Sequence, residues 1–240
     1  MIQKERIQNL NQKQIQEGNY VFYWMQASQR TEYNHALEYA VLKANELNKP
    51  LIVFFGITDD FPEANERHYY FMLEGLREVG SSLKKRGINF VVQNISSEKG
   101  AISLSNDACL VVVDRGYLKI QRKWRKDVAE KIDCQLIQVE TDVIIPIETV
   151  SNKEEYAART IRPKIHKQLD RFFVPVEENQ VQIKSINMEF PSLDLDNVDM
   201  VINKLNIDRS VKKVASFKGG TANAKRIFQE FLNSWKNTNC

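Results

Sequence analysis

The residues best placed to do chemistry in this sequence directly follow its apolar runs. An arginine in such a place can hold an anionic or carbonyl-bearing ligand, and a glycine lets a flat ring approach the backbone closely. Arg30 and Arg115 are arginines of this kind, and Gly56 is such a glycine. The candidate binding residues are Trp24, Met25, Gln26, Arg30, Gly56, Thr58, Asp114 and Arg115.

Structural roles compete with ligand binding at several of these positions. Arg30 could instead pair with Asp59 or Asp114 and so tie two loops together. Trp24 and Met25 end an apolar run, so filling the core is the alternative to contact with a planar chromophore.

The common catalytic motifs are missing from the sequence. It contains no G-x-G-x-x-G or G-x-x-x-x-G-K-[ST] cradle for phosphates and no G-x-S-x-G nucleophile elbow. Its three histidines are far apart, and no Cys/His spacing fits a zinc site. Asp59 and Asp60 could do acid/base work, but Pro62 after them favours a helix start that they cap. We therefore expect no catalytic residue and no metal site.

The candidate residues follow apolar runs of strand length, and helices are predicted between these runs. Helical spacing of apolar residues predicts helices over 33–47, with Thr31 as the N-cap, from Asp59 to Gly87, and over 118–132. Between them lie apolar runs of strand length, at 20–25, 51–56, 88–93, 110–114 and 135–140. This order predicts an α/β fold, a doubly wound five-stranded parallel sheet of Rossmann-like type. Because the carboxyl ends of parallel strands share one edge, we expect the candidate residues to meet there.

The ends of this domain are predicted from weaker patterns. Residues 1–18 are polar and should form a leading helix or arm, which leaves residues 19–173 as the α/β domain. Ser151 to Glu154 has the pattern of a capping box that opens a further helix, and Pro163 should kink or break that helix near Arg162.

The last quarter of the chain changes character. Residues 174–216 lose periodicity and are typical of an extended linker, with one short helix near 197–205. Residues 217–240 predict a terminal helix whose apolar face lies at 222–232. Such a face suits the first helix of a second domain.

Composition and charge restrict the possible partners and location. The formal net charge is +3, so no general field attracts nucleic acid. Basic residues gather at 119–126 and 159–171, where a solvated surface is the simple interpretation and direct DNA binding the alternative. No run approaches the ~20 apolar residues of a membrane span, and the start lacks a secretory signal, so we expect a cytoplasmic protein without a membrane partner. Cys109, Cys134 and Cys240 are interpreted as structural thiols.

Longer motifs spread over most of residues 20–170. They are Tyr23 to Arg30, Tyr33 to Leu37, Pro50 to Gly56, Thr58 to His68, Val113 to Leu118, Val139 to Asp142 and Lys153 to Ile165. Together they closely resemble the N-terminal part of class II cyclobutane pyrimidine dimer photolyases. Gly219, Gly220 and the helix that follows to Leu232 resemble the start of that family's catalytic domain.

The resemblance implies one half of a two-part enzyme. In that family an N-terminal antenna domain can bind a light-harvesting pigment, of deazaflavin or folate type, and a C-terminal helical domain holds FAD and the flipped dimer. The family's FAD-pocket segment has no counterpart in this sequence. The resemblance therefore implies an antenna domain at 19–173, with 217–240 as the first helix of a truncated FAD-binding domain. FAD is not expected in this chain alone.

Three functional interpretations follow from the resemblance. In the first, the chain is the antenna part of a DNA photolyase, inactive alone, which reaches damaged DNA only through a separate FAD-binding partner. In the second, it is a non-enzymatic module that binds a nucleotide or a pigment. In the third, it is a degenerate gene product whose residues 174–240 stay mobile.

Overall fold

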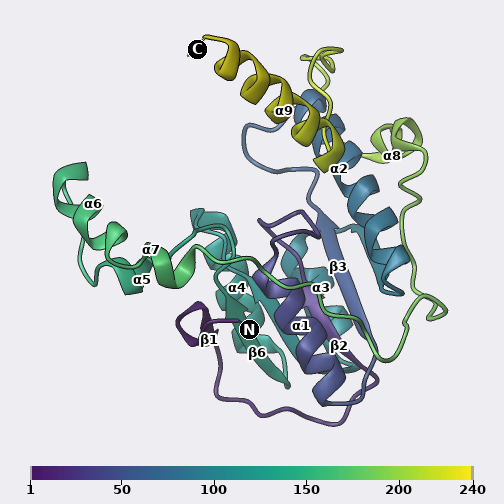
Figure 1. The fold of residues 1–240 in the computed structure, drawn as a ribbon. Helices are drawn as coiled ribbons and strands as arrows, with labels where there is room; N and C mark the ends of the chain where they lie inside the picture. The colour runs from purple at the N-terminus through teal and green to yellow at the C-terminus, as the bar shows by residue number, and fades with distance from the viewer. Residues whose placement is uncertain (1, 239–240) are drawn as a thin grey trace.

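The structure, a computed structural model, describes residues 2–238 as a layered α/β domain with two projecting segments (Figure 1). At its centre is a six-stranded sheet in the order β1-β6-β5-β2-β3-β4. The strands are β1 (Ile7–Asn9), β2 (Tyr20–Trp24), β3 (Leu51–Ile57), β4 (Asn89–Asn94), β5 (Ala108–Asp114) and β6 (Gln135–Val139). All pairs are parallel except β1 with β6. The predicted doubly wound α/β fold is confirmed, with one strand more than expected.

The additional strand comes from the leading segment. A 3-10 helix at Lys4–Arg6 precedes β1, and Ile7 pairs with Val139 on the edge of the sheet. The predicted leading helix is wrong, because β6 offers this segment a free row of backbone hydrogen-bonding groups. After β1, residues 10–18 contain no helix or strand, which agrees with the predicted arm.

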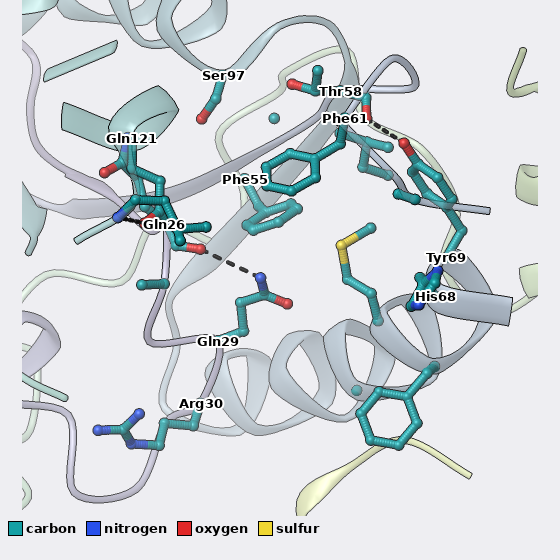
Figure 2. Close-up of a pocket in the computed structure, with 18 of the residues that line it drawn as sticks. Gln26, Gln29, Arg30, Phe55, Thr58, Phe61, His68, Tyr69, Ser97 and Gln121 are labelled. Atoms are coloured by element: carbon teal, nitrogen blue, oxygen red, sulfur yellow. Dashed lines mark hydrogen bonds between the residues drawn. The ribbon is translucent and has the colours of Figure 1, made fainter. Parts of the chain in front are cut away.

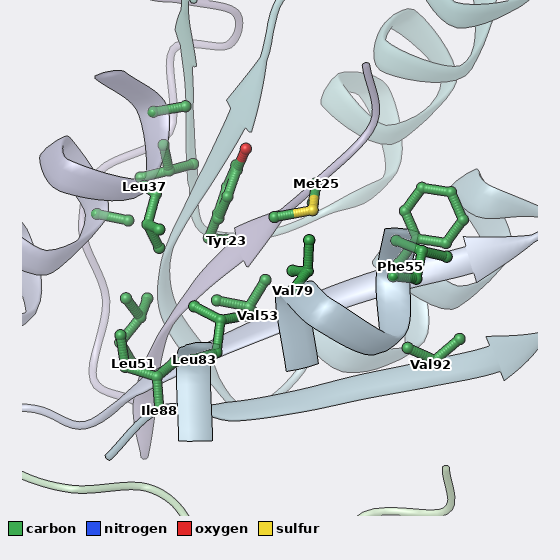
Figure 3. Close-up of a cluster of buried hydrophobic side chains, with 14 of the residues drawn as sticks. Tyr23, Met25, Leu37, Leu51, Val53, Phe55, Val79, Leu83, Ile88 and Val92 are labelled. Carbon is green, nitrogen blue, oxygen red and sulfur yellow. The ribbon is translucent and has the colours of Figure 1, made fainter. Parts of the chain in front are cut away.

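The central strands form because they are buried on both faces. Every residue of β2, β3 and β5 is buried, which explains why they lack alternation between polar and apolar residues. Tyr23 and Val53 pack on one face of the sheet (Figure 3). Phe22 and Phe54 pack on the other.

Helices cover both faces of the sheet. Leu37 of α1 and Leu76 of α2 join the first face, and Ala101 of α3 and Val128 of α4 join the second. The helices are α1 (His35–Glu46), α2 (Glu66–Lys85), α3 (Ser97–Ser105) and α4 (Lys119–Lys131). Helix α3 was not predicted, because only a few apolar residues separate its two neighbouring strands.

Two helix starts differ from the sequence prediction. Helix α1 begins at His35, and Asn34, not Thr31, accepts the capping hydrogen bond from Leu37 N. Helix α2 begins at Glu66 instead of near Asp59. The intervening residues 59–64 form a turn at the carboxyl edge of the sheet, where the Asp59 carboxylate accepts a hydrogen bond from Asn206 N rather than capping a helix.

The segment after β6 extends away from the sheet (Figure 1). It contains α5 (Ile147–Val150), α6 (Ala158–His166) and α7 (Leu169–Phe172). Ser151 does not cap α6; its hydroxyl donates to Glu155 instead. The predicted break near Arg162 is absent, since α6 continues through Pro163 to His166.

The predicted linker is bound along the sheet. Ser185 Oγ donates to Leu51 O at 2.6 Å, and Leu193 N donates to Val92 O at 2.7 Å. The predicted short helix is present as α8 (Val198–Lys204), which packs on α2. The linker therefore covers the open edge beside β4, where unpaired backbone groups would otherwise be exposed.

Helix α9 (Thr221–Thr238) follows the linker and projects from the domain near α2 (Figure 1). Cys109 and Cys134 are buried free thiols, whereas Cys240 lies outside the described residues. Within residues 2–238, no helix is both long and apolar enough to cross a membrane.

A buried ion pair fixes the start of the linker. Arg86 Nη1 lies 2.8 Å from Glu38 Oε1, and both side chains are almost fully buried. Asn179 N donates to Glu38 Oε2 at 2.7 Å, which joins the linker to α1 and α2.

Replacing Glu38 should destabilise the fold strongly. In Glu38→Gln the buried Arg86 guanidinium keeps only the exposed Glu178 carboxylate, 3.7 Å from its Nε, as a counter-charge, so we expect the free energy of unfolding to fall by about 3 kcal/mol. Urea denaturation at neutral pH measures this loss. The matched control is Glu46→Gln, which breaks an exposed pair with Lys43 and should change stability by less than about 0.5 kcal/mol. Equal effects of the two variants would contradict this role of Glu38.

Candidate functional site

A cavity of about 850 Å³ opens at the carboxyl ends of the central strands (Figure 2). It lies where the chain leaves β2 and β3, beside the point at which the strand order reverses, the usual binding position in such sheets. Most of its exposed wall is apolar. The walls contain Gln26, Ala27, Gln29, Arg30, Phe55, Gly56, Ile57, Thr58, Phe61, Ala64, His68, Tyr69, Phe71, Met72, Gly75, Ser97, Tyr117, Leu118, Gln121, Trp124, Asp142, Gly220, Thr221 and Ala224.

One buried carboxylate holds the loop that forms the polar wall. Asp114, at the end of β5, is fully buried and accepts hydrogen bonds from the backbone N–H groups of Gln26, Ala27 and Ser28 at 2.6 to 2.9 Å. Tyr23 Oη also donates to it, at 3.1 Å. Burial raises the pKa of Asp114, and the three backbone hydrogen bonds oppose that rise. Asp114 therefore positions the loop from below and does not line the cavity.

Aromatic rings form the opposite wall. Phe61 and Trp124 meet edge to face with ring centroids 6.3 Å apart, and Phe55 lies nearby (Figure 2). Flat apolar walls of this kind suit a planar ring system.

Gly56 has a packing role that the sequence prediction missed. A Cβ at this position would lie 2.8 Å from the Ser97 Cα, so glycine is needed for β3 to pass close to α3. The space above the glycine is thus filled by the protein rather than by a ligand ring, although Gly56 borders the cavity.

Buried polar atoms without a protein partner lie in these walls. Within residues 2–238, Gln26 Nε2 and Thr58 Oγ1 have no hydrogen-bond partner. The carbonyl of Thr58 does have one, because Tyr69 Oη donates to it at 2.6 Å. Gln26 and Thr58 border the cavity, but these two atoms themselves have almost no accessible surface.

Arg30 lies at the rim and is held by residues after β6. Its Nη1 donates to Asp142 Oδ1 at 2.9 Å and its Nη2 to Thr141 O at 3.2 Å. The predicted pairing of Arg30 with Asp59 or Asp114 is wrong, because the end of β6 brings Asp142 closer. The Arg30 side chain is 35% exposed at the cavity mouth.

Arg115 lies apart from this cavity. It is bound by Glu140 at 3.3 Å and Glu148 at 2.6 Å, and it borders a separate polar cavity of about 730 Å³ beside α4. These hydrogen bonds with Glu148 raise the pKa of Arg115.

Trp24 and Met25 are fully buried in the core and do not line the cavity. Trp24 acts on the cavity indirectly, because its Nε1 donates to the hydroxyl of Ser97, which is part of the wall. Of the candidate residues, the cavity brings together Gln26, Arg30, Gly56 and Thr58.

Sequence reasoning missed the aromatic wall and the contribution of α9. Trp124 belongs to the predicted helix over 118–132, and it packs partly buried against the second face of the sheet and edge to face with Phe61. Phe61 belonged to a stretch that resembled a helix start. No local signal indicates that Gly220, Thr221 and Ala224 reach the same cavity.

Two glycines and two carboxylates fix the first turn of α9 over α2. Gly219 N donates to Glu74 Oε2 at 2.8 Å, and Ala222 N donates to Glu78 Oε2 at 3.0 Å. A Cβ on Gly219 would lie 1.9 Å from the carbonyl oxygen of Phe71, so only glycine permits this approach. Carboxylates at a helix N-terminus also interact favourably with its dipole.

The fold is a Rossmann-like α/β domain with a cavity at the carboxyl ends of its strands, the edge at which sheets of this type usually bind ligands. Comparison with known families makes the assignment specific: residues 21–182 match the DNA photolyase family, and the chain belongs to it. The matched region corresponds to the N-terminal domain of that family.

Curated relatives carry the same family name. The chain is 48% identical over 233 residues to the deoxyribodipyrimidine photo-lyase of Methanothermobacter thermautotrophicus, covering 97% of this chain and 51% of that protein. It is 32% identical over 235 residues to the enzyme of Potorous tridactylus, covering 95% of this chain and 44% of the relative. The chain therefore spans about half the length of these relatives.

Solved structures share the fold. An archaeal photolyase from Sulfolobus tokodaii, described with two FAD molecules and a novel light-harvesting cofactor, matches with a TM-score of 0.61 at 20% identity. The match covers 83% of this chain and 44% of that one. A class III photolyase from Agrobacterium tumefaciens matches with a TM-score of 0.59 at 17% identity over 75% of this chain and 38% of that one.

Replacing Asp114 should disorder the cavity's polar wall. In Asp114→Asn an amide NH₂ faces backbone donors that now have no acceptor, so we expect a loss of about 2–4 kcal/mol in the free energy of unfolding. Faster hydrogen exchange at Gln26, Ala27 and Ser28 should accompany it. Asp133→Asn, at an exposed surface pair, is the control and should change neither measurement. Unchanged exchange in Asp114→Asn would exclude this positioning role.

Proposed function

We propose that this chain is the antenna domain of a class II deoxyribodipyrimidine photolyase. In this function it binds a light-harvesting chromophore and passes excitation to FAD held by a separate domain, which repairs cyclobutane pyrimidine dimers in DNA. The observation that carries the proposal is the cavity of about 850 Å³ between Phe61, Trp124 and the loop after β2. The class II assignment rests on the sequence motifs, and a cytoplasmic location is part of the same proposal.

The cavity fits a deazaflavin or folate pigment in size and chemistry. Ligand cavities generally measure about 300–1,000 Å³ and combine apolar walls with a few polar groups. Here the apolar walls suit a ring system, and Arg30 offers a cation at the mouth. When bound, such a pigment supplies light absorption. The protein's part is to bind the ring, orient it and exclude water from it.

The exposed apolar face of α9 supports the proposal of a partner domain. Ile227, Phe228 and Phe231 are between 44 and 59% exposed and border a shallow groove with Phe71 and Phe217. Exposed apolar surface of this kind usually marks an interaction site. Since the chain spans about half the length of its relatives, we propose that a FAD-binding photolyase domain covers this face. Damaged DNA would then be bound through that partner.

The purified chain should bind a planar chromophore in this cavity. We expect a deazaflavin or methenyltetrahydrofolate to bind with a shifted absorption band, whereas adenosine triphosphate should bind weakly. Trp124→Ala removes one wall and should weaken binding about tenfold or more. Phe173→Ala, at an exposed ring outside the cavity, is the control. Tight binding of adenosine triphosphate and no binding of the chromophores would instead favour a nucleotide-binding module.

Mixing the chain with a FAD-binding photolyase domain from the same genome should give a complex. We expect the two to associate at micromolar concentrations in sedimentation experiments. Light-dependent repair of cyclobutane pyrimidine dimers should occur only in the mixture. Phe228→Asp with Phe231→Asp should abolish association, since a charge would be buried in the interface. Phe173→Asp is the matched control. Association that survives the double substitution would show that α9 is not the docking face.

A further inference from the structure

The basic residues of α4 divide between two faces of the helix. Arg122, Arg125 and Lys126 line the second cavity, which measures about 730 Å³. Lys119 and Lys123 belong to the same helix but lie outside that lining. This division follows from helical spacing, because residues three or four positions apart share one face. Half of the basic cluster expected to be a solvated surface therefore borders a cavity.

The second cavity is polar, and two of its cations are accessible from it. Its lining includes β1 and β6, where Gln138 Nε2 donates to Gln8 Oε1 at 3.1 Å. Arg122 is exposed, and the side chain of Lys126 is 76% exposed. A molecule that enters the cavity can therefore reach both cationic side chains without a rearrangement of the chain.

The acidic groups near this cavity are engaged with other cations. Arg115 also lines the cavity, and it is bound by Glu140 and Glu148. Glu130 is the acidic side chain of the lining, and its Oε1 lies 3.8 Å from Lys126 Nζ. Both members of that pair are exposed, so their attraction is weak. The lining thus carries more positive than negative charge.

Arg122 and Arg125 lack a carboxylate partner. In the part of the chain that the structure describes, neither forms an ion pair, although Arg125 is only 6% exposed. Its guanidinium donates instead to Gln26 Oε1 at 3.2 Å and to Gly116 O at 2.7 Å. Burial lowers the pKa of Arg125 to about 10, an effect that the negative charge of Asp114 opposes. The group is still protonated at neutral pH, so it places a fixed positive charge beside the cavity.

We propose that this cavity is a second ligand site, for a compact anion with one or two phosphate groups, which Arg122 and Lys126 contact beside the fixed charge of Arg125. Guanidinium and ammonium groups are the usual partners of phosphate oxygens. A concave site favours a small molecule over the backbone of a nucleic acid. Tyr117, the aromatic residue of the lining, has the Arg115 guanidinium 5.5 Å from its ring centroid, which leaves no pair of rings to stack a base. This site goes beyond the proposed antenna function and does not depend on it.

Calorimetric titration of the full chain with pyrophosphate, at constant ionic strength, tests the site. We expect one pyrophosphate to bind per chain at least tenfold more tightly than sulfate, because its two phosphate groups can engage both accessible cations. Equal affinities for the two anions, or no binding of pyrophosphate at millimolar concentrations, would overturn the proposal. A single-stranded oligonucleotide that displaces pyrophosphate and binds more tightly would identify a nucleic-acid surface and would also overturn it.

Removing the two contacting charges should weaken the binding of pyrophosphate. In the double variant Arg122→Gln with Lys126→Gln, we expect its dissociation constant to rise at least tenfold, since charge-assisted hydrogen bonds are lost. The matched control is Lys119→Gln with Lys123→Gln, which removes the same charge from the same helix outside the cavity. It should raise the dissociation constant by no more than about threefold. Equal losses in the two double variants would mean that the general charge of α4 attracts the anion, and the proposal would be rejected.

Glu130→Gln provides a test in the opposite direction. This variant removes the acidic group from the lining and releases Lys126, so pyrophosphate should bind about threefold more tightly. Asp133→Asn removes the same charge at an exposed position outside the cavity and should leave the affinity unchanged. Both positions are exposed, so the fold should be retained. Unchanged or weaker binding in Glu130→Gln would contradict a phosphate site at Lys126.

The outcomes for the two proposals are distinct. Neither Arg122 nor Lys126 lines the cavity proposed for the chromophore, so their double variant should bind the chromophore as tightly as the unmodified chain does. If the unmodified chain binds a chromophore but no pyrophosphate, the second site is rejected and the antenna function is retained. If it binds pyrophosphate but no chromophore, the antenna function fails and the second site is retained.

Discussion

The buried carboxylate of Asp114 is the interaction on which the ligand site depends. It ends a central strand, and it accepts three backbone N–H groups of the loop that leaves the neighbouring strand. Removing a carboxylate from water is costly, and those hydrogen bonds offset the cost only while the loop keeps its shape. The backbone of the cavity's polar wall, including that of Gln26, is therefore fixed by the end of the sheet.

The two other walls are supplied by segments that differ in how they are held. Phe61 and Trp124 come from the turn before α2 and from α4, and they support each other edge to face. The first turn of α9 is held by Glu74 and Glu78 and by close contact at Gly219. The cavity thus joins the α/β domain to the helix whose apolar face is exposed, so a ligand there would contact both.

Agreement between sequence and structure is closest where burial alone decides the element. The runs at β2, β3 and β5 are apolar on both faces, and only a covered parallel sheet accommodates them. Disagreement occurs where tertiary contacts override local signals. Two aspartates followed by Pro62 are typical of a helix start, but α2 begins only at Glu66. The preceding residues form a turn, and Phe61 in this turn borders the cavity. Arg30 similarly pairs with Asp142, which is distant in the sequence.

By itself, the sequence determined the fold class, the five parallel strands with the helices α1, α2 and α4 between them, and the edge of the sheet at which a ligand could bind, because apolar periodicity and chain order suffice for these. Only the tertiary structure decided which side chains reach the cavity. Trp24 and Asp114 lie beneath its walls, whereas Trp124 and the start of α9 form part of them. The physical reason is that a strand's alternation and a helix's rotation place a residue on a face, but only the packing of distant segments brings those faces together.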